Sequence, residues 1–181
     1  MKKIISLIAL STLGLLVLGQ SEKHELYITA GIGTVPFIIE SLGHMVFFSD
    51  DIVRDQTNPV ITIGYQYRLS KKIRIGPEVV LDRFWINNRE NSYHFKSVLA
   101  RCDINWLSTK RVNIYSGVST GVTSKNAIET IDGVETKRNG TYLGLHVYLF
   151  CFDYKLGKFS MAFNKGLGVS GIMNLGMKYR F

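Results

Sequence analysis

Cysteine and proline are scarce in this chain of 181 residues, which contains two and three of them respectively. Two cysteines cannot build a disulfide scaffold, and they do not lie at the spacing of zinc ligands. So few prolines, set against 17 glycines, exclude a Pro-rich linker or a collagen. The hydrophobic fraction of 46% is that of a folded chain, and the length allows one domain.

Clusters that would bind metal or nucleic acid are also lacking. The net charge is +8, but the basic residues do not gather into one stripe. The four histidines are scattered along the chain. Asp50, Asp51 and Asp55 could bind a divalent cation, although a solvated acidic turn is the better interpretation. We therefore expect no metal, no cofactor and no nucleic-acid partner.

Residues 1–20 have the layout of a secretory signal peptide. Lys2 and Lys3 form a short basic start, and Ile4 to Leu18 is an uncharged, mostly apolar run. This run is shorter than the roughly 20 residues of a membrane helix, and no later stretch is long enough to span as a helix. We predict cleavage near Gly19 or Gln20, which leaves residues 21–181 as the mature domain.

The mature chain shows the period of two that is typical of β-strands. In Val60 to Leu69, apolar residues at odd positions alternate with residues such as Thr62 and Gln66. We find eight such segments, each about as long as a tilted membrane strand. They lie at about residues 26–33, 60–69, 73–82, 98–106, 112–122, 142–149, 159–164 and 172–181.

The connections between these segments alternate in length. Short ones contain residues 70–72, 108–111 and 156–158, whereas the others run over about residues 37–59, 85–93, 124–139 and 165–171. Short periplasmic turns and longer external loops are usual in an outer-membrane barrel. The pattern predicts an all-β, antiparallel, up-and-down transmembrane barrel of eight strands.

Glycine and charge indicate which face points inward. Eight glycines fall on the polar faces, and small residues are expected where the walls of a narrow barrel converge. The residues of the apolar faces are too many and too large to fit inside an eight-stranded barrel. We therefore expect the apolar faces to contact lipid and the lumen to hold an ion-paired plug. Its predicted members are Arg68, Arg74, Glu78, Asp82, Arg101, Asp103, His146, Lys178 and Arg180.

Two features of the sequence do not fit this arrangement well. Pro77 lies inside a strand, where we predict a bulge or a missing hydrogen bond of the ladder. The alternation also places Phe150 and Phe152 on the inner face of the sixth strand, which makes that face bulky for a narrow interior. Cys102 and Cys151 fall on apolar faces of strands that are not neighbours. A disulfide between these two cysteines is therefore not expected.

The end of the chain carries a resemblance. Gly176, Tyr179 and the terminal Phe181, within alternating apolar positions, resemble the assembly signal of bacterial outer-membrane barrels, which the barrel-assembly machinery reads. The mature chain is similar to small eight-stranded barrels of the OmpX and OmpA kind, and its Gly-rich final hairpin to barrels common in Bacteroidetes. This resemblance implies an outer-membrane location, and members include adhesion and structural proteins and a few lipid-modifying enzymes.

The sequence gives little support to catalysis. A serine hydrolase needs a histidine beside its nucleophile, but His94 and Ser97 are three residues apart and would point to opposite faces. His24 and His44 lie outside the predicted barrel wall, and no His-x-Ser pair occurs. We expect that the protein is not an enzyme.

We predict a monomeric barrel in outer-membrane lipid, whose external loops serve surface interaction or envelope integrity. An apolar stretch from Phe37 to Phe48 in the first loop could cap the mouth, lie on the membrane or contact an extracellular partner. Three alternatives remain open: a narrow channel, a soluble lipocalin-like ligand-binding barrel, and an outer-membrane lipid hydrolase.

Overall fold

The computed structural model describes residues 23–36, 38, 56–86, 91–131 and 134–181. The predicted signal peptide, the acidic turn at Asp50 to Asp55, His44 and nearly all of the apolar stretch from Phe37 to Phe48 lie outside these residues. The described residues form nine strands: β1 (His24–Ile32), β2 (Gln56–Thr57), β3 (Val60–Arg68), β4 (Ile73–Ile86), β5 (Asn91–Ser108), β6 (Val112–Ile131), β7 (Val134–Leu156), β8 (Phe159–Gly168) and β9 (Met173–Arg180).

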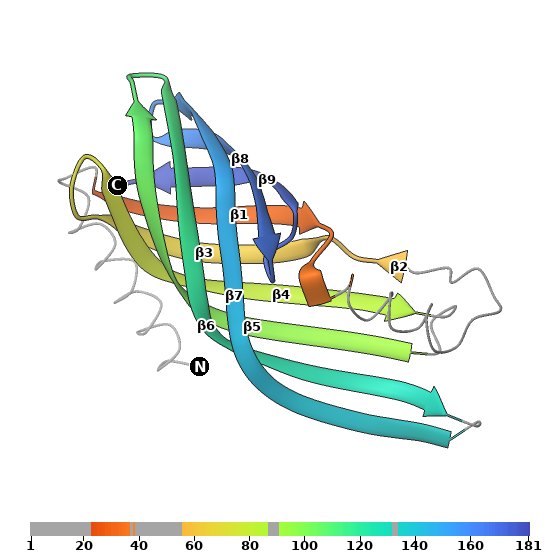
Figure 1. The fold of residues 1–181 in the computed structure, drawn as a ribbon. Helices are drawn as coiled ribbons and strands as arrows, with labels where there is room; N and C mark the ends of the chain where they lie inside the picture. The colour runs from red at the N-terminus through yellow and green to blue at the C-terminus, as the bar shows by residue number, and fades with distance from the viewer. Residues whose placement is uncertain (1–22, 37, 39–55, 87–90, 132–133) are drawn as a thin grey trace, which may run out of the picture.

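All strands except β2 join in one closed antiparallel barrel (Figure 1). Each strand pairs with the next, and β1 closes the ring by pairing with both β3 and β9. The two-residue β2 pairs only with β4. The predicted eight-stranded up-and-down barrel is therefore confirmed. Within the described residues, no helix is both long and apolar enough to cross a membrane.

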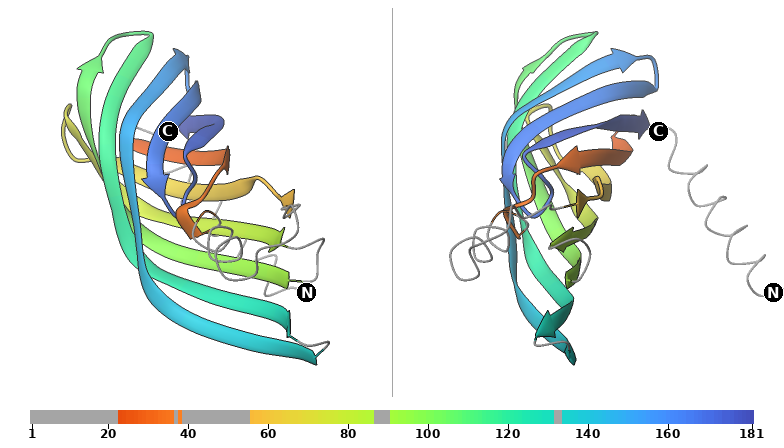
Figure 2. Two further views of the ribbon diagram at one scale, coloured as in Figure 1. Left: turned by 45° about the vertical axis from the view of Figure 1, so that its right-hand side comes forward. Right: turned by 90° about the vertical axis from the view of Figure 1, so that its right-hand side faces the viewer.

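The barrel is much taller on one side than on the other. β6 has 20 residues and β7 has 23, whereas β9 has 8. As a result, β4, β5, β6 and β7 extend beyond β1, β3, β8 and β9 at the end opposite the short turns (Figures 1 and 2). The long loops predicted over residues 85–93 and 124–139 are wrong in most of their length, because these residues continue the strands.

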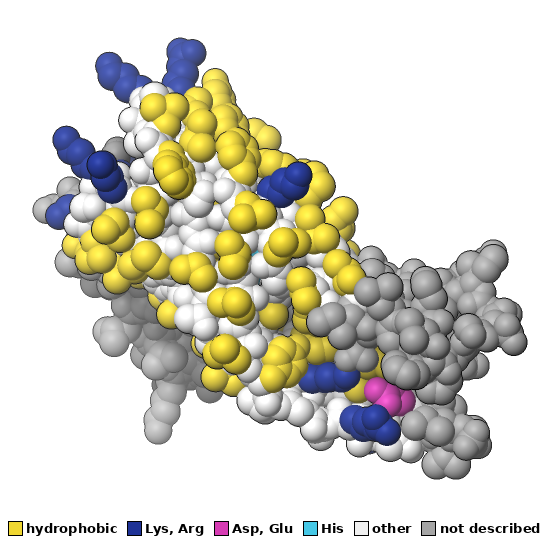
Figure 3. Space-filling model, in the orientation of Figure 1, with side chains coloured by type: hydrophobic (Ala, Val, Ile, Leu, Met, Phe, Trp, Pro, Cys, Tyr) yellow, Lys and Arg dark blue, Asp and Glu magenta, His cyan; other side chains and the backbone are white. Residues whose placement is uncertain are grey.

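The outer surface of the barrel wall is apolar. Leu175 is 66% exposed and Val98 is 63% exposed, and similar side chains cover the wall between its two ends (Figure 3). Arg74, Glu78 and Asp103 are instead buried in the interior. This orientation follows the prediction and excludes the inward apolar face of a lipocalin-like barrel. The arrangement is that of a transmembrane β-barrel.

A β-bulge in β7 corrects two predictions. The register against β8 shifts between Tyr148 and Phe150, so the alternation of inner and outer faces changes phase there. Phe150 is consequently 46% exposed on the outside, and Cys151 is buried in the lumen rather than on the apolar face. Phe152, between the buried Cys151 and Asp153, faces outward as well. Both cysteines are free, as expected.

The wall is interrupted at Pro77. β3 and β4 keep one register from Gly64 paired with Glu78 to Tyr67 paired with Ile75, but the two intervening pairs are absent. On its other side Pro77 stays in register opposite Ala100. Proline has no backbone N–H to donate to the ladder, so the predicted missing bond, rather than a bulge, occurs here.

Candidate functional site

An ion-paired cluster of buried side chains surrounds Arg74 inside the barrel. Its guanidinium group lies 2.8 Å from a carboxylate oxygen of Glu25, 3.3 Å from Asp103 and 3.4 Å from Asp153. It also lies 4.1 Å from the centre of the Tyr115 ring. These partners come from β1, β5, β7 and β6, so one side chain of β4 reaches four other strands.

Arg101 organises a second group of contacts in the lumen. Its Nε lies 2.8 Å from Asp103, and its guanidinium carbon lies 3.6 Å from the centre of the Tyr148 ring. Tyr148 donates a hydrogen bond of 3.0 Å to Glu78, and Tyr27 donates one of 2.7 Å to the same carboxylate. The carboxylate of Glu78 therefore receives hydrogen bonds from two opposed strands, β1 and β7.

Lys178 completes the cluster from β9. Its ammonium group donates hydrogen bonds to the Tyr115 hydroxyl, at 2.7 Å, and to Asp153, at 3.2 Å. The Tyr115 hydroxyl lies 2.9 Å from the side-chain oxygen of Asn164. Since β6, β7, β8 and β9 all contribute, this group ties the second half of the ring together.

The cluster is balanced in charge. Four cations (Arg68, Arg74, Arg101 and Lys178) face four carboxylates (Glu25, Glu78, Asp103 and Asp153). Burial of an ion is tolerated when it is paired and hydrogen-bonded, whereas an unpaired ion in the same place is costly. We call these eight side chains, with Tyr27, Tyr115 and Tyr148, the lumen plug.

Arg68, at the edge of the plug, and the predicted lumen residues outside it lie away from the centre of the lumen. Arg68 is half-buried at the short-turn end, where it binds Glu25 at 2.7 Å. Asp82 accepts a hydrogen bond of 2.6 Å from Thr34 toward the opposite end. His146 is buried against the Tyr148 ring, and Arg180 donates to the carbonyl oxygen of Gly157. Among the described residues, Asp82, His146 and Arg180 form no ion pair with the charged side chains of the plug.

Sequence reasoning missed Glu25 and Asp153. Glu25 lies one residue before the predicted first strand, although alternation from Tyr27 would have placed it on the inner face. Asp153 follows the bulge in β7, so unbroken alternation assigns it to the wrong side of the wall. A bulge leaves no reliable mark in the pattern of one strand, and only the Glu25 position could have been found.

Glycine makes room for the plug at Gly64. A Cβ added there would overlap the ring of Tyr27, which lies directly over the glycine. Tyr27 needs this position to reach Glu78. The predicted concentration of glycine on the inner face thus has a direct steric cause at this position.

The three residues of the predicted assembly signal lie along the seam where the ring closes. Gly176 pairs with Thr29 of β1, and Tyr179 faces outward. Phe181 exchanges two backbone hydrogen bonds with His24, of 3.2 and 3.0 Å, and its ring stacks on the imidazole of His24. The end of the chain is therefore fastened to the start of β1.

The described residues offer no assembled catalytic or metal centre. Ser97 points inward and its hydroxyl is hydrogen-bonded to that of Thr123 at 2.7 Å, whereas His94 lies on the other face of β5. In the part of the chain that the structure describes, no three His, Cys, Asp or Glu residues form a group that could hold a metal ion.

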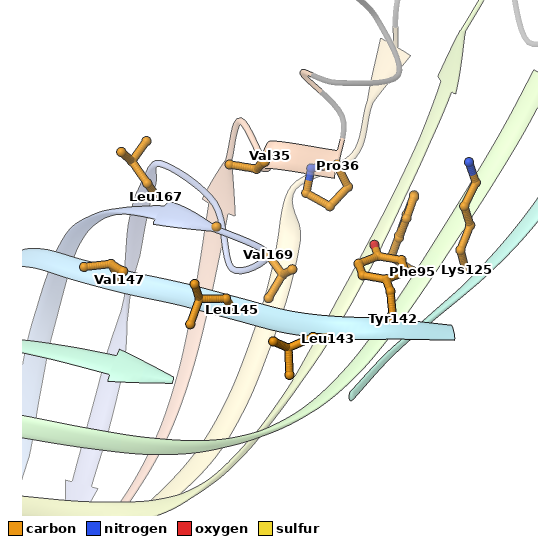
Figure 4. A pocket seen from close by; sticks show the side chains of 11 residues that line it. Val35, Pro36, Phe95, Lys125, Tyr142, Leu143, Leu145, Val147, Leu167 and Val169 are labelled. Carbon is orange, nitrogen blue, oxygen red and sulfur yellow. The ribbon is translucent and has the colours of Figure 1, made fainter. Parts of the chain in front are cut away.

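An apolar groove of about 490 Å³ opens at the rim where β8 ends and β7 continues (Figure 4). Outward-facing Leu145 and Val147 of β7 line it on one side, and Val169 and the inward-facing Phe95 line it on the other. The groove joins the lipid-facing surface to the mouth of the barrel. It exists because neighbouring strands differ in length.

No family model matches the chain, and no curated protein matches it in sequence. The crystal structure of Neisserial surface protein A (NspA) is similar, with a TM-score of 0.53 at 12% identity over 89% of this chain and 98% of that one. The Ail protein of Yersinia pestis gives a TM-score of 0.48 at 11% identity, over 88% of this chain and 97% of that one.

This chain has the fold of a small outer-membrane β-barrel. The likeness to NspA carries this conclusion and concerns the fold alone, because the identity is 12%. It bears out the predicted resemblance to eight-stranded barrels of the OmpX and OmpA kind. The likeness of the final hairpin to barrels of Bacteroidetes stays a prediction.

Proposed function

We propose that the protein is a non-enzymatic, monomeric barrel of the bacterial outer membrane, whose lumen is closed to solutes and whose tall side acts at the cell surface. The contacts that run across the lumen carry the proposal. Tyr148 of β7 binds Glu78 of β4, and Lys178 of β9 binds Tyr115 of β6. In each case the two strands are three positions apart in the ring.

A closed lumen follows from the size of these side chains. Arg74, Tyr115, Tyr148 and Glu78 are fully buried and are among the largest such side chains of the described residues. An eight-stranded barrel is only just wide enough for side chains to fill it. We therefore expect the wild-type barrel to pass no sizeable solute.

Conductance in planar bilayers tests the closed lumen. The wild-type barrel should remain electrically silent, and a double variant with Tyr148→Ala and Lys178→Ala should show discrete opening events, because it removes one side chain from each cross-lumen contact. Val98→Ala, which trims an outward side chain, is the matched control and should stay silent. Steady conductance of the wild type would favour the narrow channel instead.

The placement in the membrane is supported by a change of polarity along β5. Its outward side chains are apolar from Val98 to Trp106, and beyond this belt they are polar, at His94 and Lys96. We infer that the belt lies in the outer membrane, that the short turns face the periplasm, and that the tall strands reach the cell surface. There they would serve surface interaction or envelope integrity.

Cysteine labelling on intact cells tests this topology. A maleimide that cannot cross membranes should label Gly140→Cys, at an exposed position of β7. It should label Lys110→Cys, in a short turn, only after the outer membrane is made permeable. Equal labelling of both positions in intact cells would contradict the topology. The test also depends on export by the predicted signal peptide of residues 1–20.

We further propose that the barrel-assembly machinery recognises β9 through Gly176, Tyr179 and Phe181. The pairing of β9 with β1 supports this, since the edge of β9 that faces β1 is available for recognition only until the ring closes. The absence of catalysis is supported by the separation of His94 from the Ser97 hydroxyl. A change in lipid A on overexpression would instead favour the lipid hydrolase.

A further inference from the structure

The short-turn end of the barrel carries exposed charge of one sign. Among the described residues at this end, every exposed charged side chain is a cation. The acidic side chains nearest to it, Glu25 and Asp153, are buried and paired inside the lumen. We call the exposed set the cationic rim: Lys23, Lys71, Lys72, Lys110, Arg111 and Lys158.

Backbone hydrogen bonds fix the cationic rim in place. Each of the three short turns is bonded to the strand next to its own hairpin, and Lys23, directly before β1, is bonded to β3. The ammonium group of Lys155 adds a bond of 2.8 Å to the carbonyl of Thr109. The backbone bonds join Arg68 N to Lys23 O (2.7 Å), Asn105 N to Lys72 O (2.7 Å), Lys155 N to Arg111 O (2.7 Å) and Arg180 N to Lys158 O (2.8 Å).

Exposed apolar side chains border the rim on the side of the membrane. Trp106 is 74% exposed, Leu69 is 56% exposed and Phe159 is 50% exposed, and each lies within four residues of a rim cation. Figure 3 shows Lys and Arg gathered at this end, next to the apolar wall. Since aromatic residues mark the membrane interface, we expect the rim cations to lie at the level of lipid phosphates.

We propose that the cationic rim binds the phosphate groups of anionic phospholipids in the leaflet that surrounds the short turns. This inference rests on the proposed membrane location. The cations are spread around the circumference rather than converging on one point, which fits a lipid surface better than a single soluble anion. Each cation near an anionic membrane surface strengthens attraction about five-fold.

The opposite end of the barrel does not share this character. Its exposed Arg83, Lys96 and Lys137 are accompanied by the exposed Glu135, and Arg138 forms an ion pair with Glu129 at 3.4 Å. Positive and negative side chains are therefore mixed there. This difference supplies an internal control, because one molecule presents both kinds of end to the bilayer.

Two tryptophans allow the ends to be compared within one protein. Trp106 lies beside the cationic rim, and Trp85 lies at the loop end of β4. Trp85→Phe leaves only the first as a fluorophore, and Trp106→Phe leaves only the second. The protein is placed in vesicles of phosphatidylcholine mixed with phosphatidylglycerol, and one of the two lipids carries bromine on its acyl chains. Bromine quenches a neighbouring tryptophan, so comparing the quenching by each brominated lipid shows which lipid is more often next to that tryptophan.

At Trp106 we expect phosphatidylglycerol to be preferred at least three-fold over phosphatidylcholine. At Trp85, whose ring lies beside the single cation Arg83, we expect a clearly smaller preference. Replacing Lys71, Lys72 and Lys110 with glutamine should bring the preference at Trp106 close to one. The same replacement of Lys96 and Lys137 at the loop end should leave it unchanged. A folded barrel migrates differently from the unfolded chain when the sample is not heated before electrophoresis. Unaltered gel mobility of unheated samples would therefore show that both sets of variants still form the barrel.

Equal preference at both tryptophans, or a preference at Trp106 that survives the rim variant, would overturn the inference. So would complete displacement of phosphatidylglycerol by soluble glycerol phosphate at an equal concentration, since the rim would then be a site for free phosphate. If neither brominated lipid quenches either tryptophan, the proposed membrane location itself fails. Quenching without lipid preference refutes only the lipid-binding rim.

Discussion

Replacing Arg74 with methionine should be among the most destabilising single changes in the barrel. Methionine keeps much of the length of the side chain but removes the charge that faces Glu25, Asp103 and Asp153. The plug would then hold three cations and four carboxylates. Removing one partner of a buried pair leaves an uncompensated charge, which costs about 3–5 kcal/mol of the free energy of unfolding.

Urea titration of the folded protein in vesicles measures this loss of free energy of unfolding, with tryptophan fluorescence and the gel mobility of unheated samples as signals. Adding Glu25→Gln to Arg74→Met restores the balance of charge, so the double variant should regain about 2 kcal/mol. Arg138→Met is the matched control. Its side chain is 64% exposed and pairs with Glu129 at the surface, so it should cost less than about 1 kcal/mol.

A free energy of unfolding of Arg74→Met within about 1 kcal/mol of the wild type would contradict the predicted role of the buried ion pairs. A double variant less stable than Arg74→Met would also contradict it, because restored neutrality would then bring no benefit. Either result would mean that water inside the lumen, and not the pairing of buried ions, satisfies these charges.

Three further predictions concern packing, the seam and the bulge. Gly64→Ala should lower the free energy of unfolding by about 1–3 kcal/mol, because the added methyl group overlaps the ring of Tyr27. Gly140→Ala, where the added methyl group meets open space, should change the free energy of unfolding by less than about 0.5 kcal/mol. Deleting Phe181 removes two backbone hydrogen bonds between the end of the chain and His24. The deletion should slow folding of the barrel into vesicles, measured by the gel mobility of unheated samples. Leu156→Ala, at the same end of the barrel, is the control and should not slow folding. In a chain that lacks the other cysteine, Cys151 should resist a maleimide until urea unfolds the barrel; rapid reaction of the folded protein would place it outside the lumen.

Much of the barrel could be predicted from alternation within single strands. Val60 to Leu69 shows why: one face meets lipid and the other meets the plug, so the period of two is clear over the whole strand. The tall ends of β4, β5 and β6 were missed for a physical reason. Beyond the membrane the outward side chains turn polar, as at Lys96, while the inward Phe95 is apolar, which reverses the pattern.

The plug could be predicted only in part. Arg74, Arg101 and Lys178 lie on regular strands, so their direction follows from their position. Asp153 lies beyond a bulge, and its role depends on a register that only the pairing of two strands defines. The apolar groove arises from the unequal lengths of β7 and β8, which no pattern within either strand specifies.

The most direct test of the account is a nitroxide scan along the outer faces of β5 and β9. Labels at Val98, Ile104, Leu175 and Met177 should be more accessible to oxygen, which concentrates in lipid, than to a water-soluble nickel complex. This result would place the apolar faces in the membrane and the ion-paired side chains on the axis. Greater access of the nickel complex at these four positions would contradict the account.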